Sequence, residues 1–382
     1  MPKHVALLAL ATAALAACEQ TRSATAPATA PAAAIASALD AQRAADATGG
    51  RRAVYTLTNQ VAGNAVAVFN RAADGTLTAA GTVATGGTGT GAGLGSQGAV
   101  ALSDDGQLLF AVNAGSNDVS VFTVGSAGLS LASVTPSGGT LPISLSVHGN
   151  VLYVLNAGGN GNISGFSVGS GGTLAPIAGS TQPLSGTNVG PAEVAFSPDG
   201  RRLVVSEKNT NLLDVYAVDA NGAASGRISV ASAGGTPFGF SFGLRNELFV
   251  SEATGSASSY VLGAGPLSLV SGAVSNHQGA PCWAVVTNDG RFGFTGNGAG
   301  SVSAFTIAPD GSISLVDASG ASAVISGGVN DIALSGNSGY LYVLQTGGVQ
   351  AIHAFRIESD GHLVALGPVT GLPAGTRGLA AR

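Results

Sequence analysis

The chain has 382 residues, of which 59 are glycine, 45% are hydrophobic and only 9% are charged. A net charge of −5, with 15 lysines and arginines that form no basic cluster, argues against a nucleic acid as partner. Short apolar runs separated by glycine-rich turns favour an all-β body over a helical one.

The first 18 residues have the pattern of a processing segment. Lys3 supplies a positive charge, an apolar run follows, and small residues lead to Cys18. The apolar run is shorter than the about 20 residues that a membrane-spanning helix needs. The sequence Leu15-Ala16-Ala17-Cys18 resembles a bacterial lipobox. That resemblance implies a lipidated Cys18 at the mature N-terminus; the alternative is an ordinary cleaved secretion signal.

Residues 19–50 are rich in alanine, threonine, proline and serine and contain no aromatic residue. Such a composition buries too little apolar surface to order itself, so we expect a flexible tether. Random-coil dimensions place its two ends on the order of 30 Å apart. We therefore expect a monomer in the cell envelope, periplasmic or at the cell surface, that meets the membrane through its lipid alone.

Residues 51–382 repeat one pattern, which is clearest in residues 191–222. There an apolar run, a Ser-Pro-Asp-Gly turn, a second apolar run, a polar loop and a third apolar run follow one another. A glycine-containing turn and a fourth, weaker strand complete the unit. One four-stranded unit cannot bury its own faces, so several units must pack side by side.

Each unit ends its third strand on an aromatic residue, and a turn rich in Gly, Asn or Asp follows. These seven residues are Phe69, Phe122, Phe166, Tyr216, Tyr260, Phe305 and Phe355. Seven units in residues 53–382 average near 47 residues, close to the roughly 40–50 residues of a four-stranded propeller blade. The sequence therefore predicts an all-β, seven-bladed β-propeller.

The two ends of this region predict how the ring closes. The first unit begins at residues 52–55 with what is the second strand of other units. Residues 375–381 resemble the innermost strand of other units, such as residues 190–196. We expect the C-terminal strand to pair into the first blade, because this removes two open sheet edges.

The repeats resemble the lactonase-type seven-bladed propellers, a group that includes 6-phosphogluconolactonase-like and carboxymuconate-cyclase-like proteins. The resemblance covers the whole repeat region through its Ser-Pro-Asp-Gly turns and its closing strand. Relatives often carry Gly-Pro-Arg-His at the start of an inner strand, where this chain has Gly190-Pro191-Ala192-Glu193. Glu207 matches a glutamate of the family, and Arg377 matches an arginine before the last inner strand. The resemblance implies hydrolysis of a lactone of a sugar acid or a related small ring.

The starts of first strands and the ends of second strands should meet at one mouth of the central channel, where propellers commonly bind ligands. The candidate catalytic residues there are Glu207, Glu193, Arg377 and His277. The candidate substrate-binding residues are Asn113, Asn156, Glu252, Trp283 and Asp331. In a chain with few charges, these groups offer a general base and a cation for a developing oxyanion.

Each candidate also has a structural interpretation. Arg377 and Asp331 lie on adjacent inner strands and form either an ion pair or a substrate clamp. Glu193 and Glu207 would repel one another if close, which would raise one pKa. His277 is otherwise a surface-loop residue, and Trp283 either floors a pocket or packs between blades.

Two motif matches lack the context that their chemistry needs. The G-x-G-x-x-G match in residues 93–98 precedes a strand, without the helix N-terminus that holds a pyrophosphate. The G-x-S-x-G match in residues 239–243 has no strand–turn–helix elbow. We expect no cofactor and no bound metal, because no zinc-ligand spacing is present and nothing indicates a calcium ion in the channel.

Two classes of function remain open from the residues. One is an envelope lactonase with a lactone or sugar-derived ligand. The other is a non-catalytic propeller lipoprotein that binds a small ligand or an envelope protein. The clustered glutamates, His277 and Arg377 favour the first class, and the absent Arg-His pair favours the second.

Overall fold

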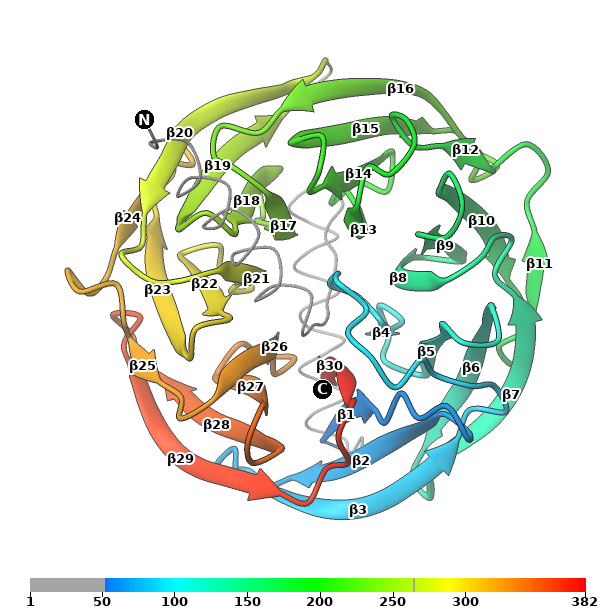
Figure 1. The fold of residues 1–382 in the computed structure, drawn as a ribbon, viewed down its shortest axis with the longest axis horizontal. Coiled ribbons are helices and arrows are strands. Elements are labelled where there is room, and N and C mark those ends of the chain that lie inside the picture. The colour runs from blue at the N-terminus through cyan, green and yellow to red at the C-terminus, as the bar shows by residue number, and fades with distance from the viewer. Residues whose placement is uncertain (1–51, 264) are drawn as a thin grey trace, which may run out of the picture.

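The structure is a computed structural model that describes residues 52–263 and 265–382. In this part of the chain every regular element is a strand, and the strands form seven sheets around a central axis (Figure 1). This confirms the predicted seven-bladed propeller. The expected signal peptide (1–18), the lipidation at Cys18, the tether (19–50) and residue 51 lie outside the described residues.

The first four blades follow the chain from inner to outer strand. Blade 1 comprises β30 (Arg377–Ala381), β1 (Ala53–Leu57), β2 (Ala65–Arg71) and β3 (Leu77–Ala84). Blade 2 comprises β4 (Val100–Leu102), β5 (Leu108–Asn113), β6 (Asp118–Gly125) and β7 (Gly128–Pro136). Blade 3 comprises β8 (Pro142–His148), β9 (Val151–Asn156), β10 (Asn162–Val168) and the short β11 (Leu174–Pro176) and β12 (Gln182–Pro183). Blade 4 comprises β13 (Pro191–Phe196), β14 (Arg202–Glu207), β15 (Leu212–Val218) and β16 (Ala224–Ala231).

The last three blades complete the ring. Blade 5 comprises β17 (Pro237–Phe242), β18 (Glu247–Glu252), β19 (Ser256–Leu262) and β20 (Leu267–Ser275). Blade 6 comprises β21 (Pro281–Val286), β22 (Phe292–Asn297), β23 (Ser301–Ile307) and the short β24 (Ile313–Leu315) and β25 (Ala323–Val324). Blade 7 comprises β26 (Gly328–Leu334), β27 (Tyr340–Thr346), β28 (Ala351–Ile357) and β29 (Leu363–Thr370).

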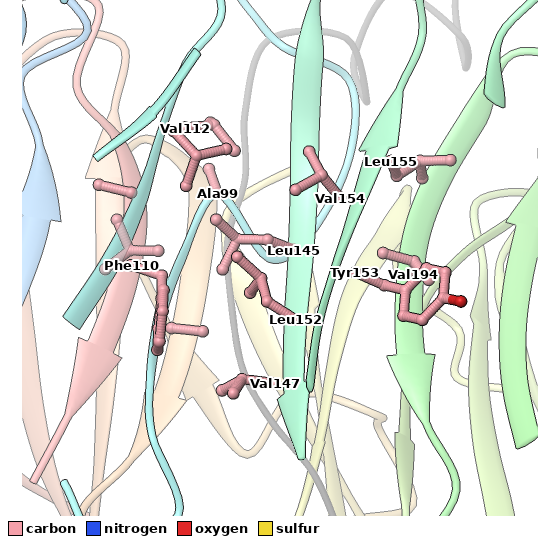
Figure 2. Close-up of a cluster of buried hydrophobic side chains, with 14 of the residues drawn as sticks. Ala99, Phe110, Val112, Leu145, Val147, Leu152, Tyr153, Val154, Leu155 and Val194 are labelled. Carbon is pink, nitrogen blue, oxygen red and sulfur yellow. The ribbon is translucent and has the colours of Figure 1, made fainter. Parts of the chain in front are cut away.

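Burial explains the composition of the strands. The second strands, such as β5, β14 and β18, are buried almost throughout because a neighbouring blade covers each face of the sheet. Their sequences are therefore nearly continuous apolar runs rather than alternating ones. Figure 2 shows this packing, with Phe110, Leu145 and Val154 from different strands in one cluster. The outer strands, such as β7 and β20, are mostly exposed.

The closing strand pairs as predicted. β30 runs antiparallel to β1, with Val54 opposite Ala381 and Tyr55 opposite Ala380. Beyond it, Arg71 Nε donates to the Arg382 carbonyl at 2.9 Å. The last strand is therefore held by its ladder and by a side chain from the second strand of the chain, which makes closure part of the fold's cooperative core.

Leu379 offers a direct test of closure, because its side chain is fully buried in a cluster with Val54, Tyr342 and Leu344. We expect Leu379→Ala to lower the free energy of unfolding by about 2–5 kcal/mol through a cavity in the closing strand. Urea unfolding measures this change. Leu269→Ala, at an exposed position of β20, is the matched control and should stay within about 0.5 kcal/mol of the parent. Equal effects at both positions would contradict the account of closure.

Candidate functional site

The ends of the second strands form a buried polar position in every blade. The residues are Thr58, Asn113, Asn156, Glu207, Glu252, Asn297 and Gln345. In three blades this residue bonds to the serine at the third position of the next strand. Asn113 Nδ2 donates to Ser120 Oγ at 2.7 Å, and Asn297 Nδ2 donates to Ser303 Oγ at 2.9 Å. Ser258 Oγ donates to Glu252 Oε1 at 2.6 Å.

These repeated bonds tie each second strand to the third strand and to the loop that arrives from the preceding blade. Asn156, for example, donates from Nδ2 to the Ser137 carbonyl at 3.2 Å and to Asn162 Oδ1 at 2.8 Å. Asn113 and Asn156 are thus placed inside their blades and not on an open channel wall. Their role in substrate binding stays a prediction, while their structural role follows from these contacts.

Glu252 accepts four hydrogen bonds inside blade 5. The donors are Ser232 Oγ at 3.0 Å, the Gly234 amide at 2.7 Å, Ser256 Oγ at 2.7 Å and Ser258 Oγ at 2.6 Å. Two carboxylate oxygens offer about four acceptor sites, so this side chain is saturated. The contacts favour a structural role for Glu252 over a contact with substrate.

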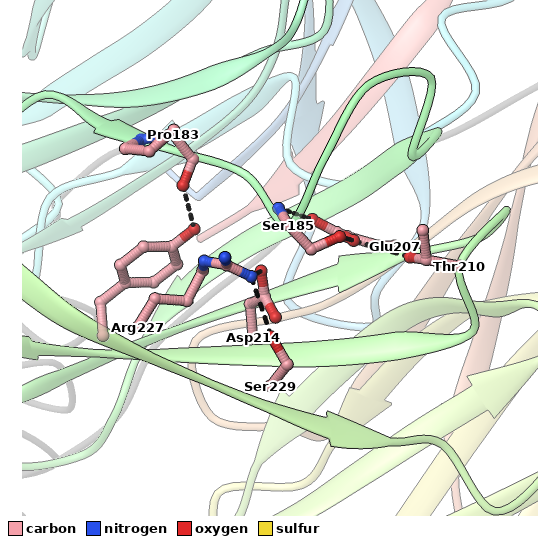
Figure 3. Close-up of polar contacts among 8 residues, drawn as sticks. Pro183, Ser185, Glu207, Thr210, Asp214, Arg227 and Ser229 are labelled. Carbon is pink, nitrogen blue, oxygen red and sulfur yellow. Dashed lines mark hydrogen bonds and ion pairs between the residues drawn. The ribbon is translucent and has the colours of Figure 1, made fainter.

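Glu207 is likewise buried, at the junction of blades 3 and 4 (Figure 3). Its carboxylate accepts from the Ser185 amide at 2.9 Å, from the Ser185 hydroxyl and from Thr210 Oγ1 at 2.6 Å. Asp214 of β15 lies beside it, and Arg227 Nη1 donates to Asp214 Oδ2 at 3.0 Å. Burial raises the pKa of Asp214, and the nearby charge of Glu207 raises it further.

Glu193 lies at the inner edge of the ring, where it accepts a hydrogen bond from a main-chain amide of the next blade. The inner strand of each blade has no further strand on its axial side, so some of its amides need other acceptors. Glu193 Oε2 accepts from the Phe240 amide of the next blade at 2.7 Å. Ser144 and Ser146 of blade 3 cap Val194 and Phe196 of blade 4 in the same way, at 3.2 and 3.1 Å.

The environment of Glu193 corrects one expectation. Glu193 is only 2% exposed, so it is buried among these contacts and does not stand at an open channel mouth. Its pKa is raised well above 4.5 because burial disfavours the charged form, while hydrogen bonds from Phe240 and Gln97 oppose the rise. Repulsion by Glu207 is not among the causes of this raised pKa.

The connection between β3 and β4, residues 85–99, which we term the strap, lies against Glu193. Figure 1 shows it extending from the rim toward the centre of the ring. Near its tip, the Gln97 amide donates to the Ala192 carbonyl of blade 4 at 2.8 Å. The Gln97 carboxamide bonds to both main-chain groups of Ala284 in blade 6, at 2.8 and 2.9 Å. Gln97 is not among the site residues predicted from the sequence.

A second sector of the ring comprises β21, β26 and β30, the inner strands of blades 6, 7 and 1. Arg377 and Asp331 interact electrostatically there, as their adjacent strands predict. Burial lowers the pKa of Arg377 to about 10, and the charge of Asp331 opposes this shift. The Arg377 guanidinium donates from Nη1 to the Thr376 carbonyl at 2.6 Å.

Three buried polar atoms in this sector have no hydrogen-bond partner within residues 52–263 and 265–382. They are Trp283 Nε1, Asn330 Oδ1 and Arg377 Nε. Trp283 is fully buried and meets Phe238 edge-on, with ring centroids 5.7 Å apart. It packs between blades in a cluster with Val329 and Ile332, so this interpretation is favoured over a pocket floor. Asn330 was not recognised from the sequence.

His277 lies apart from these groups. It is exposed in the connection from β20 to β21, and its Nδ1 is 3.4 Å from Ser275 Oγ. The structure brings Arg377 and Asp331 together and sets Glu193 against the strap. It places Glu207, Glu252, Asn113 and Asn156 in separate networks, each at the end of its own second strand. Among the described residues, no group of three or more His, Cys, Asp or Glu side chains could hold a metal ion.

The raised pKa of Glu193 predicts a pH dependence of stability. The folded protein holds this proton more tightly than the unfolded chain, so the stabilisation is full below the ordinary pKa of 4.5 and is lost as the pH rises through the folded pKa. Glu193→Gln stays neutral and should flatten this part of the profile of urea midpoint against pH. Glu358→Gln, at a more exposed carboxyl, should keep the parent slope. Parallel profiles for the parent and Glu193→Gln would refute the assignment.

Comparisons with known proteins agree with the fold. The profile of the family described as "Lactonase, 7-bladed beta-propeller" matches residues 48–189, which include the first three blades except β30. No curated protein matches the chain in sequence. No helix among the described residues is long and apolar enough to cross a membrane.

Solved structures show the same architecture at low identity. A candidate 6-phosphogluconolactonase of Bacteroides fragilis is 18% identical with a TM-score of 0.70, and the match covers 88% of this chain and 99% of that one. The periplasmic gluconolactonase of Pseudomonas aeruginosa is 17% identical with a TM-score of 0.68, and the match covers 86% and 99%. Together with the profile match over residues 48–189 and the closed ring of seven sheets, they show that the chain has the seven-bladed β-propeller fold and is similar to lactonase-type propellers.

Proposed function

We propose that this lactonase-like propeller hydrolyses a lactone of a sugar acid or a related small ring in the sector formed by β21, β26 and β30. One observation carries the proposal: three consecutive inner strands hold buried polar atoms that other described residues leave without hydrogen-bond partners. These atoms are Trp283 Nε1, Asn330 Oδ1 and Arg377 Nε. Buried polar atoms are normally paired, so such a group favours a bound polar ligand.

The residues of this sector match the needs of ester hydrolysis. A water oxygen attacks the acyl carbon while a base takes the water's proton, and the ring C–O bond then breaks. The ring oxygen gains a proton, and the product is an open-chain hydroxy acid. Arg377 stays cationic at neutral pH, which supports a role in stabilising the oxyanion, and we assign the role of base to its neighbour Asp331.

The resemblance to named lactonases supports the same reaction class. The two solved structures above are described as a candidate 6-phosphogluconolactonase and as a gluconolactonase. Arg377 also occupies the position at which relatives carry an arginine before the closing strand. Glu193 and Glu207 already have structural roles, because their carboxyls accept hydrogen bonds from amides or hydroxyls of the fold.

A second candidate is a propeller that binds a ligand without turning it over. The hydrogen bonds to Glu207 and Glu252 favour it, since two of the predicted acidic groups have structural partners. The replacement of an Arg-His pair by Ala192 and Glu193 points the same way. The two candidates share the sector of β21, β26 and β30 and differ in whether product forms.

Turnover of a panel of aldonolactones by the full chain tests the proposal. We expect Asp331→Asn and Arg377→Lys each to lower kcat/KM by about 10²-fold or more, because a base or an oriented cation is lost. His277→Ala, at the exposed rim, is the control and should retain parental turnover. Full activity of both sector variants would exclude this site. Binding of the lactones without product would establish the second candidate instead.

We further propose that Cys18 anchors the protein in the cell envelope, in keeping with its lipobox-like sequence and with a periplasmic relative. The parent should partition into the detergent phase of a Triton X-114 extract because of its acyl chains, which favour an apolar phase. Cys18→Ser should move it to the aqueous phase. An aqueous parent protein, with an intact mass that shows no lipid, would contradict the anchor.

A further inference from the structure

The strap, residues 85–99, is longer than its counterparts. It has fifteen residues, whereas the other six connections from an outer strand to the next inner strand have three to seven. Seven of the fifteen residues are glycine. A four-stranded blade needs no such length to reach its neighbour, so the strap has a role of its own in the channel.

The base of the strap is tied to blades 1 and 2. Asn59 Oδ1 accepts from the Thr90 amide at 3.0 Å, and Asn59 Nδ2 donates to the Ala92 carbonyl at 2.8 Å. The Gly115 amide donates to the Thr88 carbonyl at 2.9 Å. These contacts hold residues 88–92 on the rim. Residues 91–93 are exposed, and two of them are glycines, so the chain can bend where base and tip meet.

The tip, residues 94–98, reaches blades 3, 4 and 6 through polar contacts. Ser96 Oγ donates to the Ile143 carbonyl at 3.1 Å, and the Leu145 amide donates to the Gly98 carbonyl at 2.7 Å. Lys208 Nζ donates to the Gly95 carbonyl and lies 4.9 Å from the centroid of the Phe238 ring. Leu94 is the only large apolar side chain in the tip.

Gln97 fills a place that the repeat leaves empty. Ser144 and Glu193 cap the inner strand of the following blade, but the equivalent residue of blade 5 is Gly239. A Cβ atom built on Gly239 would lie 2.0 Å from Gln97 Oε1. The Gln97 carboxamide therefore takes the position of the missing side chain and caps Ala284.

We propose that the tip of the strap is a removable plug of the channel. When it lifts, Gln97 leaves Ala284 and Glu193, and the inner edge of blade 6 and this carboxyl become accessible to a ligand. The tip is buried, but hydrogen bonds make most of its contacts and Leu94 is its one large apolar side chain, so we expect it to open without global unfolding. The proposal concerns access of a ligand to the inner edge of the ring. It rests on the proposed function only if that ligand is taken to be a lactone.

Hydrogen exchange of the full chain, resolved by peptide, tests the plug without any need for turnover. In the parent, amides of residues 94–98 and the Ala284 amide should exchange at least 10-fold faster than the ladder amides of β14 and β22. Gln97→Ala should speed exchange at Ala284 at least a further 10-fold. Exchange of the tip only at the rate of the slowest ladder amides would overturn the proposal.

Ser146→Ala is the matched control, because it removes a side-chain cap from the same ring without touching the strap. It should speed exchange at Phe196 and leave residues 94–98 within about 2-fold of the parent. If Ser146→Ala and Gln97→Ala change the tip equally, the effect is global and the plug is refuted. If the tip opens but the protein hydrolyses no lactone, the proposed reaction is refuted and the proposed plug is still supported.

Discussion

The open inner edge of each blade is the constraint on which the rest of this structure depends. Seven inner strands face one axis, and a main-chain amide buried there without a partner is costly. Ser144, Ser146 and Glu193 each reach to the next blade to supply acceptors. The closing strand solves the same problem for β1 through backbone pairing. Closure of the ring and polar side chains near the axis therefore both serve to pair main-chain amides of the inner strands.

This constraint gives several of the acids near the axis a structural role. Glu193 caps an amide, and Glu207 and Glu252 bind inter-blade loops and third strands. Burial of all three requires that neighbouring donors satisfy them. In the sector of β21, β26 and β30, polar atoms of Trp283 and Arg377 on the inner strands lack such partners among the described residues; Asn156 Oδ1 and Asp214 Oδ1 lack them farther from the axis. The charged residues nearest the axis thus divide into a structural group and a candidate binding group.

The fold could be predicted from the sequence because each blade repeats the same short-range pattern of apolar strands, turns and an aromatic strand end. The seven aromatic ends of the third strands lie in strands and are buried, and residues 377–381 close the ring. The site was harder to predict because it depends on contacts between blades that no local pattern reveals. Glu207 and Asn113 end their strands as expected, yet their side chains turn into the blade. Gln97 was hidden in a glycine-rich loop, and only the excess length of that loop signalled it.

The central claim is that side-chain caps satisfy the inner edge as far as Ala284 of blade 6, and that a ligand binds the unpartnered polar atoms of blades 6, 7 and 1. A crystal structure of the protein soaked with gluconate, a stable hydrolysis product of a sugar lactone, tests this most directly. The account predicts density within hydrogen-bond distance of Arg377 and Asn330, with Glu207 and Glu252 still bound to their serines. Density against Glu207 or Glu252 instead, with those bonds broken, would contradict it.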